Sequence, residues 1–154
     1  MLVGLISDTH GMLRPEALRA LDGAAMILHA GDVGGAALLE RLGLIAPVHA
    51  VRGNVDPADA LPPAVDITLD GVRVHVSHGH ELGSPTPERL LARYDADVIV
   101  YGHTHEPLLR RIGTTVIVNP GAAGARRFDL TPSVALLELP NVVVSFVDLT
   151  APLC

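Results

Sequence analysis

Short apolar runs that end in glycine and metal-ligating side chains recur along this sequence. One of them is Val98-Ile99-Val100, which leads through Tyr101 into Gly102-His103-Thr104-His105. A short apolar run of this kind predicts a buried strand, and glycine allows the backbone to turn sharply directly after it. The two histidines are therefore expected in the loop at the carboxyl end of a strand.

Four earlier segments end in the same way. Strand-like runs stop at Asp8-Thr9-His10, at Gly31-Asp32, at Gly53-Asn54 and at His78-Gly79-His80. Each stop places oxygen or imidazole ligands just beyond the end of a strand. One His-x-His pair is a weak signal, but five such loops in one chain constrain both fold and function.

The first third of the chain alternates strands and helices. Strands are expected at 2–6, 25–28 and 47–51, with helices from Pro15 and over 35–42. This alternation predicts a parallel, doubly wound sheet, in which ligands bind outside the carboxyl ends of the strands. Asp8, Asp32 and Asn54 all fall at such ends. Asp8 lies too far upstream to cap the helix that begins near Pro15.

The remainder of the chain is expected to form antiparallel hairpins and one further helix. Asp70-Gly71 is a strong two-residue turn signal between two alternating runs, and Thr86-Pro87-Glu88 opens a helix. Two more hairpins are expected over 108–118 and 134–147. Parallel units followed by hairpins predict an α/β fold in which two packed sheets form a sandwich flanked by helices.

The amino-acid composition restricts the classes of protein to which this chain can belong. A chain of 154 residues is most simply one domain, 1–154, and 49% hydrophobic with 3% aromatic residues predicts a core of Val, Leu, Ala and Ile. Eleven Arg, no Lys and 17 acidic residues give a net charge of -6, which argues against general nucleic-acid binding.

The single Cys154 excludes an intrachain disulfide and a Cys-based zinc site, and it fits a reducing compartment. Without a basic leader segment or a run of about 18 apolar residues, we expect a soluble, cytoplasmic protein with no membrane partner.

Seven side chains at the strand ends mix carboxylate, amide and imidazole groups: Asp8, His10, Asp32, Asn54, His78, His103 and His105. One divalent ion needs only about four to six ligands, so seven suit two ions that share a bridge. Two ions roughly 3.5–4 Å apart clamp the attacking and leaving oxygens of a phosphoryl displacement and lower the pKa of a bridging water. The ions also supply positive charge for a phosphate, despite the acidic chain.

The five loops resemble the five signature blocks of the calcineurin-like metallophosphoesterases, and the match runs from Leu2 to about Leu139. Asn119-Pro120-Gly121, which precedes an Arg-containing loop, and the segment 132–135 resemble the small bacterial and archaeal phosphodiesterase branch. The resemblance implies a four-layer αββα architecture with two sheets between helices. It also implies two divalent metal ions, often Mn²⁺, with Ni²⁺, Zn²⁺, Fe or Mg²⁺ as alternatives.

The resemblance further implies a division of the ligands between the two ions. Asp8, His10 and His105 would hold one ion, and Asn54, His78 and His103 the other, with Asp32 as the bridge. Asn54 would also touch the phosphate, so Asn54 and Asp32 are expected to be the catalytic residues.

Two positions depart from the family pattern. Many members carry a histidine after the Asn of the third block, where it protonates the leaving group or steadies the phosphate; here this residue is Val55. The small branch often has Cys there, so the change does not preclude catalysis, but it favours substrates with good leaving groups. His80 could be recruited as the acid. The usual Ser after Asn-Pro-Gly is Ala122, which removes one phosphate donor.

Other polar residues receive weaker assignments. Arg52, His80 and Arg126 are candidate substrate-binding residues, and Arg127 is a neighbour with the same potential, because guanidinium suits phosphate oxygens. Arg52 lies at a strand end, where an arginine is as often part of a surface ion pair. Asp56 is expected to cap or buttress the Asn54 loop. Three further histidines are expected to be structural or solvent-facing: His29, His49 and His75.

We therefore predict a dinuclear metal-dependent phosphodiesterase that hydrolyses small phosphate esters through a metal-bridging hydroxide. One alternative is a phosphomonoesterase or nucleotide pyrophosphohydrolase with the same site. A second is a non-catalytic scaffold, because one eukaryotic trafficking subunit keeps this fold and works through protein contacts, although all seven ligand positions are filled here. A third is a zinc-storage or regulatory protein. Few charges and long apolar strands make a homodimer plausible.

Overall fold

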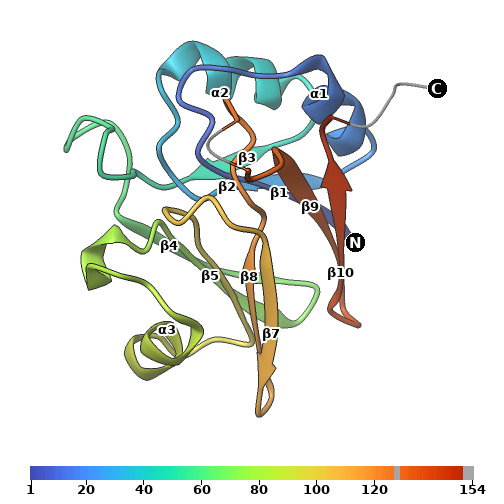
Figure 1. Cartoon of the computed structure of the whole chain (residues 1–154). Helices are drawn as coiled ribbons and strands as arrows, with labels where there is room; N and C mark the ends of the chain where they lie inside the picture. The colour runs from blue at the N-terminus through green and yellow to red at the C-terminus, as the bar shows by residue number, and fades with distance from the viewer. Residues whose placement is uncertain (127–128, 151–154) are drawn as a thin grey trace.

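Two five-stranded sheets pack face to face, with helices on their outer faces (Figure 1). The computed structural model describes residues 1–126 and 129–150. The elements are β1 (Leu2–Ile6), α1 (Pro15–Leu21), β2 (Met26–His29), α2 (Ala36–Gly43), β3 (Val48–Ala50), β4 (Ala64–Leu69), β5 (Val72–Ser77), the 3₁₀ turn η1 (His80–Leu82), α3 (Pro87–Arg93), β6 (Val98–Val100), β7 (Leu108–Ile112), β8 (Thr115–Asn119), β9 (Ser133–Glu138) and β10 (Val143–Asp148).

The first sheet has the order β10-β9-β1-β2-β3, in which β1, β2 and β3 run parallel and the last hairpin joins antiparallel. The expectation of a doubly wound sheet is wrong. Leu21 of α1 and Leu42 of α2 belong to the same hydrophobic cluster, so both helices cover one face. Successive right-handed crossovers in one direction place their helices on one face, and the second sheet occupies the other.

The second sheet has the order β4-β5-β6-β8-β7, with β5, β6 and β8 parallel and an antiparallel strand at each edge. Asp70 and Gly71 form the predicted β4–β5 turn, with φ of 53° and 79°. Both values lie in the left-handed region that a type I′ hairpin turn requires. Thr86 caps α3, because its hydroxyl accepts a hydrogen bond from the Arg89 backbone N–H.

Apolar residues of both sheets alternate between two environments. Val98 and Val100 of β6 point into the layer between the sheets, where Leu5 and Leu28 of the first sheet meet them. Ile99, between the two valines, packs on the outer side with residues of α3. Because both faces of these strands are buried, they are apolar throughout, which is why short unbroken runs mark them in the sequence.

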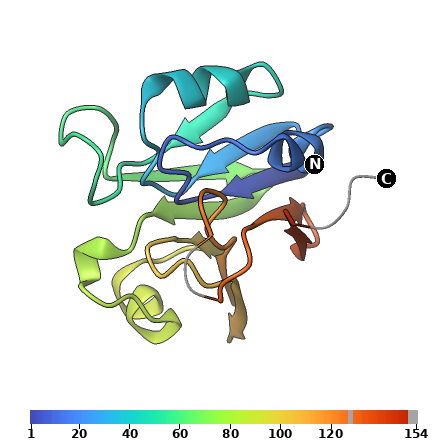
Figure 2. The same cartoon turned by 45° about the horizontal axis from the view of Figure 1, so that its top comes forward.

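The carboxyl ends of β1, β2 and β3 in one sheet and of β5 and β6 in the other emerge at a common edge of the sandwich. Figure 2 shows the two sheets as stacked layers, with the blue strands of the first above the green strands of the second. Within the described ranges, 1–126 and 129–150, the structure contains no helix of the length and apolarity that a membrane crossing needs.

Candidate metal centre

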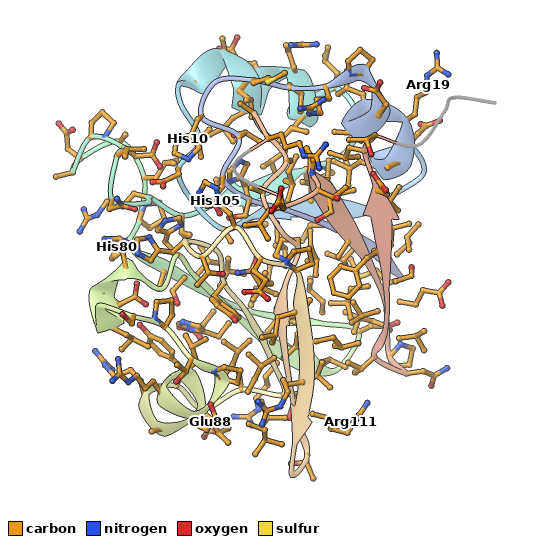
Figure 3. All side chains as sticks on the ribbon, in the orientation of Figure 1. His10, Arg19, His80, Glu88, His105 and Arg111 are labelled. Carbon is orange, nitrogen blue, oxygen red and sulfur yellow. The ribbon has the colours of Figure 1, made fainter. Side chains whose placement is uncertain are left out.

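The seven predicted ligand residues follow the strand ends of both sheets. The first sheet supplies Asp8, His10, Asp32 and Asn54, and the second supplies His78, His103 and His105. Figure 3 shows the labelled His10, His105 and His80 in one region of the molecule, away from Glu88 and Arg111. The loops of the two sheets therefore meet where the sequence predicts the site.

A first group of potential ligands consists of Asp8, His10 and His105, whose ligand atoms all lie within 4.8 Å of one another. Nε2 of His105 is 3.3 Å from Oδ1 of Asp8, and Nε2 of His10 is 4.0 Å from the same oxygen. These are the three residues that the family resemblance assigns to one ion.

A second group is centred on His78. Its Nε2 lies 3.2 Å from Oδ2 of Asp32, 3.1 Å from Oδ1 of Asn54 and 3.8 Å from Oδ1 of Asp8. The ring of His103 lies edge-on to the His78 ring, with 5.2 Å between their centroids. Asp32 and Asn54 thus lie around Nε2 of His78, and the group here whose ligand atoms all lie within 4.8 Å of one another is Asp8, Asp32 and His78.

Asp32 lies between the two groups. Its Oδ2 is 3.7 Å from Nε2 of His10 and 3.2 Å from Nε2 of His78, so one carboxylate oxygen faces a member of each group. Burial opposes ionisation, but the hydrogen bonds from His78 and from the Val55 backbone N–H outweigh it and lower the pKa of Asp32 to about 2. Asp32 therefore presents a charged carboxylate at neutral pH.

The orientation of His78 is set from outside the site. Its Nδ1 lies 2.7 Å from the carbonyl oxygen of Ala30, which can only accept, so this nitrogen carries the proton. Burial lowers the pKa of His78, but Asp32 and Asp8 raise it above its ordinary value overall. A cation that bound Nε2 would displace the second proton, and the Ala30 carbonyl would continue to fix the ring.

The carboxylate of Asp8 is buried and has unused bonding capacity. Oδ2 accepts hydrogen bonds from the Ser7 hydroxyl at 2.6 Å and from the His103 backbone N–H at 3.2 Å. Burial would raise the pKa of Asp8, yet His105, the charge of His78 and Ser7 together lower it. Oδ1 makes no hydrogen bond with any described residue, nor does the buried Nδ1 of His105.

This donor set fits divalent cations. Asp8 and Asp32 are 1% and 3% exposed, and the cationic partners recorded for their carboxylates are imidazoles, which are charged only when protonated. Two buried carboxylates without a permanent countercharge are costly. A mixture of carboxylate, amide and imidazole donors suits zinc, manganese and related ions.

The backbone at the site is bent in an unusual way. Seven described non-glycine residues have positive φ, and five of them are predicted ligands: Asp8 (53°), His10 (49°), Asp32 (54°), His103 (72°) and His105 (64°). The left-handed region is uncommon for residues with a side chain, and Asp and His are among those that tolerate it best. Such strain concentrates at functional sites, where the surrounding structure holds it.

Two glycines allow the loops to approach this closely. A Cβ on Gly53 would collide with the carboxylate of Asp32, and a Cβ on Gly102 would collide with Oγ of Ser7 and Oδ2 of Asp8. The glycine in Gly53-Asn54 and in Gly102-His103 is therefore required by packing against a predicted ligand.

Hydrogen bonds between loops support the site, and sequence reasoning missed most of them. The Gly31 backbone N–H donates to Nδ1 of His29 at 3.1 Å, and Nε2 of His29 donates to the Thr9 hydroxyl at 2.9 Å. That hydroxyl in turn donates to the Val33 carbonyl at 2.7 Å. Burial lowers the pKa of His29 to about 4, so His29 stays neutral in this relay. Of the two roles predicted for His29, structural or solvent-facing, the structure shows the structural one, because its side chain is fully buried.

Two further residues brace the ligand loops. Asp56 accepts hydrogen bonds from the backbone N–H groups of Val33, Gly34 and Gly53, as its predicted buttressing role requires. Nδ2 of Asn119 donates to the Gly102 carbonyl at 3.1 Å and to the Thr104 hydroxyl at 3.0 Å. The sequence singled out Asn119 only through the family pattern; the contact with the distant histidine loop has no local signal.

The three candidate substrate-binding residues occupy different positions. The His80 ring is 5.3 Å from that of His78 and 6.4 Å from that of His103, measured between centroids. Arg52 donates to the Ala58 carbonyl and lines a cavity with His80.

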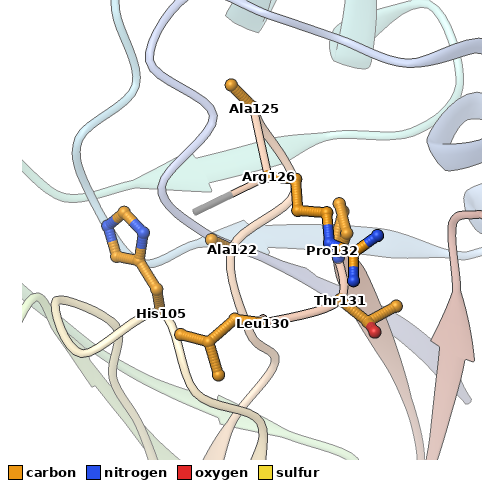
Figure 4. A pocket seen from close by; sticks show the side chains of 7 residues that line it. All are labelled: His105, Ala122, Ala125, Arg126, Leu130, Thr131 and Pro132. Atoms are coloured by element: carbon orange, nitrogen blue, oxygen red, sulfur yellow. The ribbon is translucent and has the colours of Figure 1, made fainter. Parts of the chain in front are cut away.

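Arg126 lines a small pocket together with His105. Figure 4 shows its guanidinium turned towards Thr131 and Pro132, on the opposite side of this pocket from His105. Arg127 lies outside the described residues.

Comparison with known proteins finds relatives named as metallophosphoesterases and phosphodiesterases. The chain is 35% identical to a probable metallophosphoesterase of Methanothermobacter thermautotrophicus, over 96% of this chain and 87% of that protein. It is 33% identical to the phosphodiesterase YfcE of Escherichia coli, over 93% and 89%. The solved structure of Vps29 complexed with Zn²⁺ from Entamoeba histolytica superposes with a TM-score of 0.81 at 26% identity, over 97% of this chain and all of that one. Because residues 1–141 match the model of the calcineurin-like phosphoesterase superfamily domain, the chain belongs to that superfamily.

Proposed function

We propose that this protein is a dinuclear metal-dependent phosphodiesterase, with Mn²⁺ as the working ion. The observation that carries the proposal is the position of Asp32, whose Oδ2 faces Nε2 of His10 at 3.7 Å and Nε2 of His78 at 3.2 Å. A carboxylate oxygen between two ligand groups suits a bridge between two ions. The family is dinuclear and metal-dependent, and one relative is named a phosphodiesterase.

In this proposal Asp8, His10 and His105 hold one ion, and Asn54, His78 and His103 hold the other. When bound, two such ions neutralise the phosphate and lower the pKa of water at the site. The ions would also provide the countercharge that the buried carboxylates lack. The lone Cys154, which favours a reducing compartment, supports a cytoplasmic location.

The protein side chains orient the reaction. Asn54 is exposed, and its amide lies next to His78, where its Nδ2 is available to donate to a phosphate oxygen. Asp32 stays ionised at neutral pH and contributes charge without taking up a proton. Val55 is 57% exposed at the position of the usual leaving-group acid, so the departing alkoxide receives no proton from that side chain. We therefore propose substrates with good leaving groups.

Hydrolysis of bis-p-nitrophenyl phosphate by metal-stripped protein, before and after Mn²⁺ is added, tests the proposal. We expect turnover only with the metal, and a loss of at least about 10³-fold in the Asp32→Asn variant, because the bridging charge is removed. Asp95→Asn, which neutralises an exposed carboxylate paired with Arg73, is the matched control and should retain wild-type turnover. Metal-independent turnover, or an active Asp32→Asn variant, would refute the mechanism.

A second candidate is a metal-binding protein without turnover. The similarity to Vps29 complexed with Zn²⁺ favours it, because that protein shares the fold over nearly the whole of this chain. Tight binding of two ions by calorimetry, with no hydrolysis of the diester or of p-nitrophenyl phosphate, would support this candidate. Hydrolysis of the monoester alone would identify a phosphomonoesterase.

A further inference from the structure

A cavity of about 260 Å³ opens beside the candidate metal centre, and its walls include Arg52, His80, Arg93 and Tyr94. It lies between the loop after β3, the start of β4, the turn after β5 and the end of α3. His80 connects the cavity to the centre, because its ring is 5.3 Å from that of the predicted ligand His78. A substrate held at the centre would therefore have this space next to it.

The charged groups of the cavity favour an anion. Arg52, Arg93 and His80 contribute donors, and Glu81 is the acidic residue among the described lining residues. The Glu81 carboxylate already accepts hydrogen bonds from the Gly79 backbone N–H at 2.9 Å and from the Tyr94 hydroxyl at 2.7 Å. Its acceptor capacity is therefore directed into the wall. Arg52 already gives one N–H to the Ala58 carbonyl, so the donors left for a ligand are its remaining N–H groups and the Arg93 guanidinium.

The aromatic ring in the wall is already engaged. Tyr94 stacks on His75 with 3.8 Å between ring centroids, and the Arg93 guanidinium carbon lies 5.2 Å from the Tyr94 ring centre. A ligand ring would have to displace one of these partners. Nδ1 of His80, by contrast, is buried and makes no hydrogen bond with any described residue. Recognition in this cavity therefore rests on charge and hydrogen bonding.

We propose that the cavity binds a second anionic group, a carboxylate or a phosphate, carried by one of the two ester substituents of the substrate. The inference rests on the proposed phosphodiesterase function and adds a substrate class to it: phosphodiesters that bear an additional negative charge. Guanidinium is the side chain best matched to both anions, because its planar donors pair with two oxygens at once.

A charge-matched pair of substrates tests the proposal. One is 4-nitrophenyl 4-carboxyphenyl phosphate, and the other carries a carboxamide in place of the carboxylate. With Mn²⁺-loaded protein, we expect kcat/KM for the carboxylate to exceed that for the amide by roughly fivefold, the range of a partly exposed charge pair. The preference should shrink from low to high salt because the charges are screened.

Arg93→Gln should abolish the preference, because kcat/KM for the carboxylate falls to the value for the amide. Arg93 is an exposed residue at the end of α3 and has no part in the metal centre. Arg41→Gln removes the same charge from an exposed position in α2 and should keep the preference. Equal rates for the two substrates in wild-type protein, or an unchanged preference in Arg93→Gln, would overturn the proposal.

A binding experiment separates this inference from the proposed function. Calorimetry on Mn²⁺-loaded protein compares 4-carboxyphenyl phosphate with 4-carbamoylphenyl phosphate and requires no turnover. Tighter binding of the carboxylate, lost in Arg93→Gln, would support the anion subsite even if no diester were hydrolysed. Equal affinities of the two compounds in wild-type protein would overturn the subsite even if the diesterase activity were present.

Discussion

The hydroxyl of Ser7 donates a 2.6 Å hydrogen bond to Oδ2 of Asp8, and both side chains are buried. This bond leaves the other carboxylate oxygen, Oδ1, directed at the imidazoles of the site. Ser7 comes from the end of β1 and has no ligand role of its own. It acts as a positioning residue for Asp8.

The Ser7→Ala variant is expected to bind Mn²⁺ about 10- to 100-fold more weakly, because hydrogen-bonding partners of metal ligands contribute on this scale. Calorimetric titration of metal-free protein measures the change. Ser133→Ala is the matched control, since it removes a buried 2.7 Å hydrogen bond to the Pro120 carbonyl. Both variants should lose about 1 kcal/mol of stability, but only Ser7→Ala should lose metal affinity. Equal metal affinity in the two would rule out positioning by Ser7.

Metal binding should raise the melting temperature. At a hundredfold excess over its Kd, an ion that binds only the folded state stabilises it by about 2.7 kcal/mol, which corresponds to roughly 5–10 °C for a domain of this size. The shift should be smaller in Asp32→Asn and unchanged in Asp95→Asn. Scanning calorimetry with EDTA and with Mn²⁺ provides the comparison. An identical melting temperature with and without metal would contradict the two-ion site.

His29 should make the folded protein less stable in mild acid. Its pKa is about 4 when folded and 6.5 ordinarily, so between these values the unfolded chain binds a proton that the folded chain does not. The contribution of His29 to the free energy of unfolding is therefore fully present above pH 6.5. It decreases as the pH drops towards 4, by roughly 3 kcal/mol in total.

Urea unfolding of wild type and His29→Gln from pH 7 to pH 4 tests this dependence. Other groups titrate in both proteins and cancel in the difference, so wild type should lose more stability than the variant. His49→Gln, the same change at a half-buried position in β3, serves as the control. Parallel profiles for wild type and His29→Gln would exclude His29 as the source.

Restoring a histidine at position 55 should relax the dependence on leaving group. For a series of aryl methyl phosphates, kcat/KM of wild type should fall steeply as the leaving-group pKa rises. Val55→His should flatten this slope and speed the poorest leaving groups by roughly 10²-fold, as general acid catalysis does. The side chain of Val55 is exposed, and the hydrogen bond from its backbone N–H to Oδ1 of Asp32 does not depend on the side chain.

Val55→Gln has a polar side chain without a useful acid and should keep the wild-type slope. If Val55→His and Val55→Gln gave the same slope, the acid would come from elsewhere, with His80 as the next residue to replace.

Much of the fold and of the candidate site could be predicted from the sequence because the signals are local. Val98 to Val100 form an unbroken apolar strand, Asp70-Gly71 forms the expected turn, and the ligand residues follow strand ends. Parallel strands gather such ends at one edge. Both sheets contribute predicted ligands for the same reason, because each ligand loop follows the carboxyl end of a strand.

What escaped prediction depends on contacts between distant segments. The alternation of strands and helices does not state which face a helix covers, so the prediction of a doubly wound sheet around β1 to β3 is wrong, whereas the prediction of two packed sheets is confirmed. The relay from Thr9 to His29 spans 20 residues, and Asn119 reaches back 17 residues to Gly102. No periodicity or turn signal encodes such pairs.

The division of the seven residues between the two sheets would give ions bound there a mechanical role. Asp8, His10, Asp32 and Asn54 belong to one layer, and His78, His103 and His105 belong to the other, so neither layer carries all of the predicted ligands. Ions bound there would cross-link the two sheets at one edge of the sandwich, where polar loops take the place of the apolar core. Metal affinity would then depend on how closely the two sheets pack. A substitution that separates the sheets would weaken metal binding even though it replaces none of the predicted ligands.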